Sequence, residues 1–296
     1  KVLLLFLFTT VMFLQSGFSQ DLYWVNGQGN WNDPEHWSTS SGGKGGAAVP
    51  TFDNNVIIDG NSFTGSGQYI NIKGKANCND LIWKENSGNY GLKSRSFLFK
   101  NWTGTRLQIA GSIMLPDNIK NEFYGDIILK SGQDNNTIDI KTPLNDDLIF
   151  DGSQGKWSLN SNLKAEGDIL LKQGHLNTND QDIECNNFIG SGKKERSINL
   201  TSSVIKVNQW DFENPDNLNY NSGTSLIMVS ELSKNKLKTG DLNFNASKYE
   251  LQGKALTVNS IIDSADCYQD PSGSIQLNVS GGTKPYTYKL DTAGGD

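Results

Sequence analysis

Short apolar runs recur through the middle of the chain at a nearly constant spacing. The phrase at 126–129, an Asp followed by three apolar residues, returns at 147–150 and at 168–171, a step of 21 residues each time. Looser copies occur at 80–83, 106–109, 187–189 and 209–212. A fixed period near 20 residues, built from short strands, is typical of a β-solenoid in which each repeat forms one coil.

A second strand type lies between these phrases. The segments 137–140, 156–159 and 197–200 alternate polar and apolar residues, so one row of side chains faces inward and the other outward. We therefore expect an all-β, right-handed parallel β-helix with coils of about 20 residues. An antiparallel β-sandwich is the alternative, but it predicts hairpin turns every ~8–12 residues rather than a repeated phrase.

The solenoid predicts a continuous apolar interior. Ile127, Leu148 and Ile169 occupy equivalent positions in the three best copies of the phrase. Stacking one coil on the next would place these side chains in one ladder, and each buried aliphatic side chain contributes about 1.5–3 kcal/mol. We assign residues 67–262 to this domain, with an inserted loop at 213–238 and a resumption of the coil phrase at 240–244.

The segment before the solenoid, residues 21–66, is rich in tryptophan and glycine. Trp24, Trp31 and Trp37 fall within a short span, and large rings can close the open end of an apolar stack. We therefore predict a capping segment. The alternative is an exposed aromatic platform that binds sugar.

Residues 1–20 predict a secretory signal peptide. An apolar run follows Lys1 and ends at Leu14, which is shorter than the ~20 residues of a membrane-spanning helix. Gly17 and Ser19 are small residues two positions apart, as signal peptidase requires, so we expect cleavage after Ser19 or Gln20. An uncleaved membrane anchor is the alternative. The remainder of the chain is expected to be exported and soluble.

Charge and cysteine content exclude some classes of protein. The formal net charge is −6 and the longest basic run is Lys193-Lys194, which argues against nucleic acid as the partner. The cysteines, Cys78, Cys185 and Cys267, are too far apart for a zinc ribbon. One disulfide could form in an oxidising compartment, and the sequence leaves the pair open.

The last segment, residues 263–296, predicts a different fold. It contains an alternating strand at 274–280, the turn Gly281-Gly282-Thr283-Lys284-Pro285 and a second strand at 286–290. Two strands alone are marginal in water. We therefore expect the natural protein to continue beyond Asp296.

The motifs of this segment carry a resemblance. Cys267, then Gly273-Ser274-Ile275, then the run from Gly281 to Tyr288 resemble the SprB-type repeat of gliding-motility adhesins from Bacteroidota. The resemblance covers roughly the last 30 residues, and Leu290 stands where that repeat has a Trp. Around Tyr23-Trp24-Val25, the chain is also similar to the opening of large secreted surface proteins of that phylum. The resemblance implies a truncated Ig-like repeat, export by a type IX secretion system and display on the exterior of the outer membrane.

No catalytic or cofactor-binding residue is assigned. A hydrolytic triad needs a His base beside a nucleophile, and the two histidines are His36 in the cap and His175 in an expected coil corner. Neither is flanked by a G-x-S-x-G phrase. We predict that both are surface or packing residues.

Metal binding has one candidate region. Five carboxylates that could serve as Ca²⁺ ligands lie close in sequence: Asp134, Asp139, Asp146, Asp147 and Asp151. The chain has no EF-hand loop and no glycine-rich calcium repeat, so solvated corner carboxylates are the preferred interpretation. We expect no cofactor and assign no metal ligand, and a structural Ca²⁺ is left open.

Three functional hypotheses remain. The first is a non-catalytic secreted adhesin or scaffold module of the cell surface, associated with gliding motility or attachment, with surface glycans or other surface proteins as partners. The second is a polysaccharide lyase or glycosidase on a β-helix, for which Glu184, Glu195 and Arg196 are available. The third is a glycan-binding module. Fold analogy alone does not license an activity, so the first hypothesis is preferred.

Overall fold

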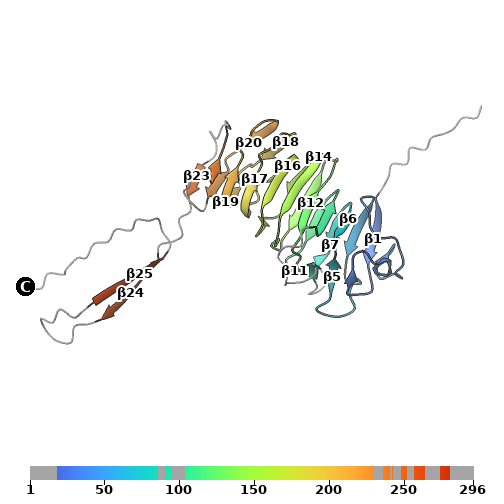
Figure 1. The fold of residues 1–296 in the computed structure, drawn as a ribbon. Helices are drawn as coiled ribbons and strands as arrows, with labels where there is room; N and C mark the ends of the chain where they lie inside the picture. Colours follow the sequence, from blue (N-terminus) through green and yellow to red (C-terminus); the bar gives the residue numbers. More distant parts are fainter. Residues whose placement is uncertain are drawn as a thin grey trace, which may run out of the picture.

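The computed structural model describes residues 19–85, 91–94, 104–229, 236–240, 242, 248–251, 257–263 and 274–280. Within these residues the regular structure is almost entirely β-strand, and a turn of 3-10 helix spans Pro34–His36. Parallel strands stack coil upon coil along the molecule, as Figure 1 shows. The predicted β-solenoid is confirmed.

Each regular coil contributes a strand to three faces. Face A contains β1 (Gln20–Trp24), β4 (Asn54–Ile58), β7 (Leu81–Trp83), β10 (Ile113–Leu115), β13 (Asn136–Ile140), the ends of β14 (Leu148–Leu159) and β16 (Ile169–Asn177), β18 (Arg196–Asn199) and β20 (Leu218–Asn221). Face B contains β6 (Lys75–Cys78), β9 (Arg106–Ile109), β12 (Asp126–Leu129), the starts of β14 and β16, the ends of β17 (Ile183–Ile189) and β19 (Val204–Asp211), and β22 (Leu237–Lys238).

Face C runs through β15 (Leu163–Lys164), the starts of β17 and β19, β21 (Leu226–Val229) and β23 (Lys248–Leu251). The N-terminal coils form a separate parallel sheet, which contains β2 (Gly29–Asn30), β5 (Tyr69–Ile72), β8 (Gly91–Ser94) and β11 (Lys120–Glu122). The antiparallel partner of β1 is β3 (Trp37–Ser38).

The interior ladder of face B follows the repeated phrase. Ile127 pairs with Leu148, which pairs with Ile169, and the ladder continues through Phe188 to Trp210. All five side chains are buried. The prediction of this ladder is therefore confirmed, including the looser copies of the phrase at 106–109, 187–189 and 209–212.

Two sequence assignments within the solenoid are wrong. The copy of the phrase at 80–83 forms β7 on face A, whereas β6 occupies the corresponding place on face B. Period-two alternation distinguishes inside from outside but not one face from another. The predicted insertion at 213–238 instead contains β20, β21 and β22, which pair with the preceding coil. Because Leu237 pairs with Trp210, the face B strand of this coil lies before the predicted resumption at 240–244.

The N-terminal tryptophans are packing residues. Trp24, Trp31 and Trp37 are at most 1% exposed, and Trp37 meets each of the other two rings edge-on with centroids 5.0 Å apart. The indole Nε1 atoms of Trp24 and Trp37 donate to the Gly27 and Trp31 carbonyls at 2.7 and 2.6 Å. Burial of the rings contradicts the sugar-platform alternative. The parallel stack already includes β1 and β4, so it extends into the segment that the sequence assigns to the cap.

A two-stranded antiparallel sheet follows the solenoid in the sequence. It pairs β24 (Thr257–Asp263) with β25 (Ser274–Ser280), and β25 coincides with the predicted strand. Because β24 pairs with β25, the predicted boundary between residues 262 and 263 falls within this sheet. The predicted strand at 286–290 and residues 1–18 of the predicted signal peptide (1–20) lie outside the described residues, and Gln20 is the first residue of β1. The part of the chain that the structure describes has no helix that is long and apolar enough to cross a membrane.

Candidate functional site

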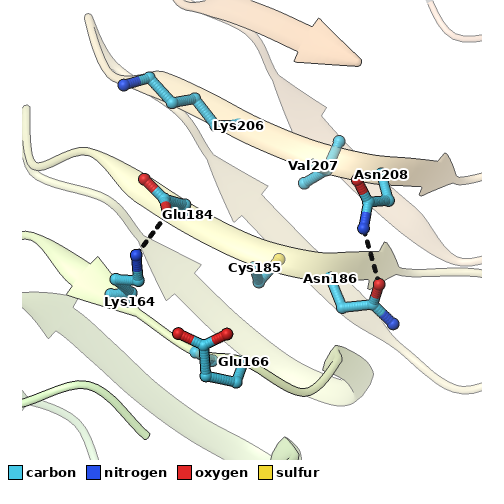
Figure 2. Close-up of a pocket in the computed structure, with 9 residues that line it drawn as sticks. Lys164, Glu166, Glu184, Cys185, Asn186, Lys206, Val207 and Asn208 are labelled. Atoms are coloured by element: carbon cyan, nitrogen blue, oxygen red, sulfur yellow. Dashed lines mark hydrogen bonds and ion pairs between the residues drawn. The ribbon is translucent and has the colours of Figure 1, made fainter. Parts of the chain in front are cut away.

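Three successive coils of face C enclose a polar hollow of about 390 Å³ (Figure 2). The same three positions of each coil line it: Lys164, Ala165 and Glu166, then Glu184, Cys185 and Asn186, then Lys206, Val207 and Asn208. Strand register places Glu184 between Lys164 and Lys206. The hollow is therefore a product of stacking, because residues about 20 positions apart become neighbours.

Period-two alternation decides which side chains the hollow presents. Ala165, Cys185 and Val207 are buried. The residues on either side of each of them face outward and are polar, so the hollow carries two outward columns. One column is charged, and the other contains Glu166 and two asparagines.

The charges of the hollow are partly paired. Lys164 Nζ lies 2.6 Å from Glu184 Oε1. The hydrogen bond and the charge of Glu184 raise the pKa of Lys164, and the nearby charge of Glu166 adds to this effect. Both side chains of the pair are about half exposed (47% and 50%), so solvent screens the interaction and it adds little stability. Asn208 Nδ2 donates to Asn186 Oδ1 at 2.9 Å.

The cysteine of the hollow is buried and protonation of its thiol is favoured. The thiol of Cys185 is 7% exposed and donates to the Asn187 carbonyl at 3.5 Å. Burial raises its pKa, whereas the reactive form is the thiolate. Cys78 is also free and buried, so these two cysteines form no disulfide. Cys267 lies outside the described residues.

The histidines lie away from the hollow. The ring of His36 stacks on Trp24 with centroids 4.8 Å apart, and its Nδ1 lies 2.9 Å from the Val25 carbonyl oxygen. His175 lies on face A, in register with Lys156 and Ser197. Neither histidine lines the hollow.

The residues considered for an enzyme do not form one site. Only Glu184 lines the hollow. Arg196 begins a face A strand and is 1% exposed, and its guanidinium donates to the Lys194 and Asn214 carbonyls at 2.6 and 3.0 Å. Burial lowers its pKa. Arg196 therefore connects two corner loops, a role that sequence analysis missed because a buried arginine leaves no periodic signal.

The acidic residues that the sequence groups together lie in separate regions of the structure. Asp126, Asp146 and Asp147 have carboxylate oxygens within 4.8 Å of one another at the corner that precedes face B. The pKa values of Asp146 and Asp147 are raised, first by burial and then by neighbouring carboxylates. By contrast, Asp134 lies 3.0 Å from Lys156, and Asp151 lies 3.8 and 3.6 Å from Lys130 and Lys194.

Sequence analysis missed Asp126 as a member of this cluster, although the repeated phrase contained the signal. Asp126 and Asp147 begin two copies of the phrase, and stacking of Ile127 on Leu148 places the preceding acids side by side. Asp139 belongs to another region, on face A in register with Met114.

Comparison with known proteins gives one match. Residues 259–295 match the family model of the SprB repeat. No curated protein and no solved structure matches the chain. The match agrees with the resemblance seen in the sequence and covers 37 of the 296 residues. The chain therefore combines a β-solenoid with a segment similar to a SprB repeat.

Proposed function

We propose that this chain is a non-catalytic module of a secreted cell-surface protein, in which the solenoid provides an adhesive or spacing element. The observation that carries this proposal is the SprB-repeat match at 259–295, which follows the parallel stack in the sequence. The resemblance of such repeats to gliding-motility adhesins of Bacteroidota extends the proposal to type IX export and to a role in gliding or attachment.

The architecture supports a mechanical and binding role. Three parallel faces surround one continuous apolar core that extends from β1 to β21. Each coil contacts only its neighbours, so a solenoid presents an extended surface along its length. Polar positions on that surface can change without disturbing the core.

Display on the surface is the first test. Antibodies against the solenoid should label intact cells of the source bacterium, and inactivation of its type IX secretion system should abolish the labelling. A periplasmic marker serves as the control for cell integrity. Detection of the antigen only after lysis would contradict the proposal.

A carbohydrate-active enzyme is the second candidate, because two carboxylates, Glu166 and Glu184, line one hollow. Paired carboxylates are the machinery of glycoside hydrolysis. Glu184, however, already forms an ion pair with Lys164 at 2.6 Å. We expect no reducing ends to be released from a polysaccharide panel, and release that Glu184→Gln abolishes would favour the enzyme.

A further inference from the structure

We propose that the hollow on face C binds a zwitterionic saccharide, with an ammonium group of the ligand at Glu166 and a carboxylate at Lys206. The inference rests on the proposed surface function and specifies the chemistry of the ligand. The saccharide would lie along the solenoid axis and cross three coils.

The charge pattern of the hollow is dipolar. The ion pair between Lys164 and Glu184 cancels two of the four charges. Glu166 and Lys206 remain, both exposed, and neither makes an ion pair with another residue in the described part of the chain. Figure 2 shows them at opposite ends of the hollow.

Strand register sets the separation of these two charges. Lys206 lies two strands beyond the coil that carries Glu166. Strands in a sheet are about 4.8 Å apart, so the two positions are roughly 10 Å apart along the axis. Charge-assisted hydrogen bonds are about 2.8 Å long, so a ligand that lies between the two side chains needs its own charges roughly 5 Å apart. This is of the order of one sugar unit, so neighbouring amino and acidic sugars present charges of opposite sign at a suitable spacing.

Amide groups occupy the space beside the charges. Asn186 accepts from Asn208 at 2.9 Å and donates to Asp168 Oδ1 at 2.8 Å. A side-chain amide has two donor hydrogens and two lone pairs, so Asn186 keeps hydrogen-bonding capacity for a sugar hydroxyl. No aromatic side chain lines the hollow, and ring stacking therefore adds nothing to affinity. Recognition would depend on charge-assisted hydrogen bonds, which are strong and geometrically selective.

Binding of three matched oligosaccharides to the chain from residue 20 onward tests this inference. De-N-acetylated hyaluronan carries alternating amines and carboxylates, hyaluronan carries only the carboxylates, and chitosan carries only the amines. Calorimetry at low salt should show the zwitterionic probe binding roughly tenfold more tightly than the other two, since one extra charged hydrogen bond separates them. High salt should weaken this preference because exposed charges are screened.

Variants locate the binding to the hollow. Glu166→Gln and Lys206→Gln should each reduce the affinity for the zwitterionic probe roughly tenfold. Lys193→Gln and Glu195→Gln are matched controls at exposed positions outside the hollow and should leave affinity unchanged.

Equal affinity of the three probes, or wild-type affinity in both hollow variants, would overturn the inference. Neither result would affect surface labelling, which tests the proposed function separately. Conversely, loss of labelling would leave the binding data of the purified chain intact.

Discussion

The interior ladder of face B and the polar hollow of face C are built by the same repeat, yet they vary in opposite ways. Along the ladder, Ile127, Leu148 and Ile169 keep their apolar character from coil to coil, and the larger Phe188 and Trp210 continue it. Along the hollow, Lys164, Glu184 and Lys206 alternate in charge at one register position. The interior of the solenoid must therefore stay apolar in every coil, whereas the charge of a surface position can change from one coil to the next.

Removal of an interior aromatic ring should have the largest effect. Trp210 is fully buried and stacks on Phe212 with centroids 4.3 Å apart. Trp210→Ala should lower the free energy of unfolding by about 3–5 kcal/mol, as large-to-small substitutions in cores do. Chemical denaturation measures the loss. The control Phe52→Ala removes a ring that is 40% exposed and should change stability by less than about 0.5 kcal/mol.

Loss of the buried arginine should have the next largest effect. Arg196→Ala leaves the Lys194 and Asn214 carbonyls without their donor, and unsatisfied buried groups cost about 1–3 kcal/mol. The control Arg106→Ala alters a side chain that is 44% exposed and 3.8 Å from Asp126. Equal stabilities of these two variants in a denaturant titration would show that Arg196 contributes nothing to the stack.

The acidic corner should give a smaller effect of opposite sign. Because the folded state raises the pKa of Asp147 above its usual value of 3.8, it binds protons that the unfolded state releases. Stability therefore falls as pH rises from the unfolded pKa through the folded pKa. Asp147→Asn should add about 0.5 kcal/mol at neutral pH, because it removes a partly buried charge and, to a smaller extent, like-charge repulsion. This gain should disappear below pH ~4.

Thermal unfolding of this variant from pH 3 to 7 tests the sign, with Asp134→Asn as a control because Asp134 already has Lys156 as a partner at 3.0 Å. The measurement is made in EDTA and again with Ca²⁺. In EDTA, a loss of stability on Asp147→Asn at neutral pH would refute the argument that the buried, repelled charge of Asp147 destabilises the fold. A loss seen only with Ca²⁺ would show that the corner binds the ion.

The smallest effect on stability is expected in the hollow. Glu166→Gln and Lys206→Gln change exposed side chains and should alter the free energy of unfolding by less than about 0.5 kcal/mol, while they reduce affinity for the zwitterionic probe. A large change in stability would mean that the columns of the hollow are part of the packing, and the contrast between the two regions would fail.

The sequence predicted what is periodic. The phrase at 126–129 and its copies predicted the solenoid and its interior ladder because coils of similar length repeat the same apolar positions. The prediction failed where coils change length or lose apolar character. β7 was assigned to the wrong face, and the coil that contains β20, β21 and β22 was taken for a loop. Leu218 and Tyr220 are only half-buried, so that coil carries a weak pattern.

The hollow could not be predicted for a related reason. Glu184 was considered as an isolated acid, but Lys164, Glu166 and Lys206 join it only through strand register. The apolar interior fixes the strand register. The charged residues on the surface do not recur from coil to coil, so they add no periodic signal to the sequence. Recognition of such a site requires alignment of the coils before the polar columns are compared.

Size-exclusion chromatography of the chain with a zwitterionic oligosaccharide of defined length, after prolonged incubation, tests the central claim most directly, because one elution profile reports both binding and cleavage. The account predicts co-elution of the oligosaccharide at its original length with wild-type chain, and its separation from the chain in Glu166→Gln. Shortened products would contradict a non-catalytic module, and an intact oligosaccharide that elutes alone from the wild-type chain would contradict the hollow as its binding site.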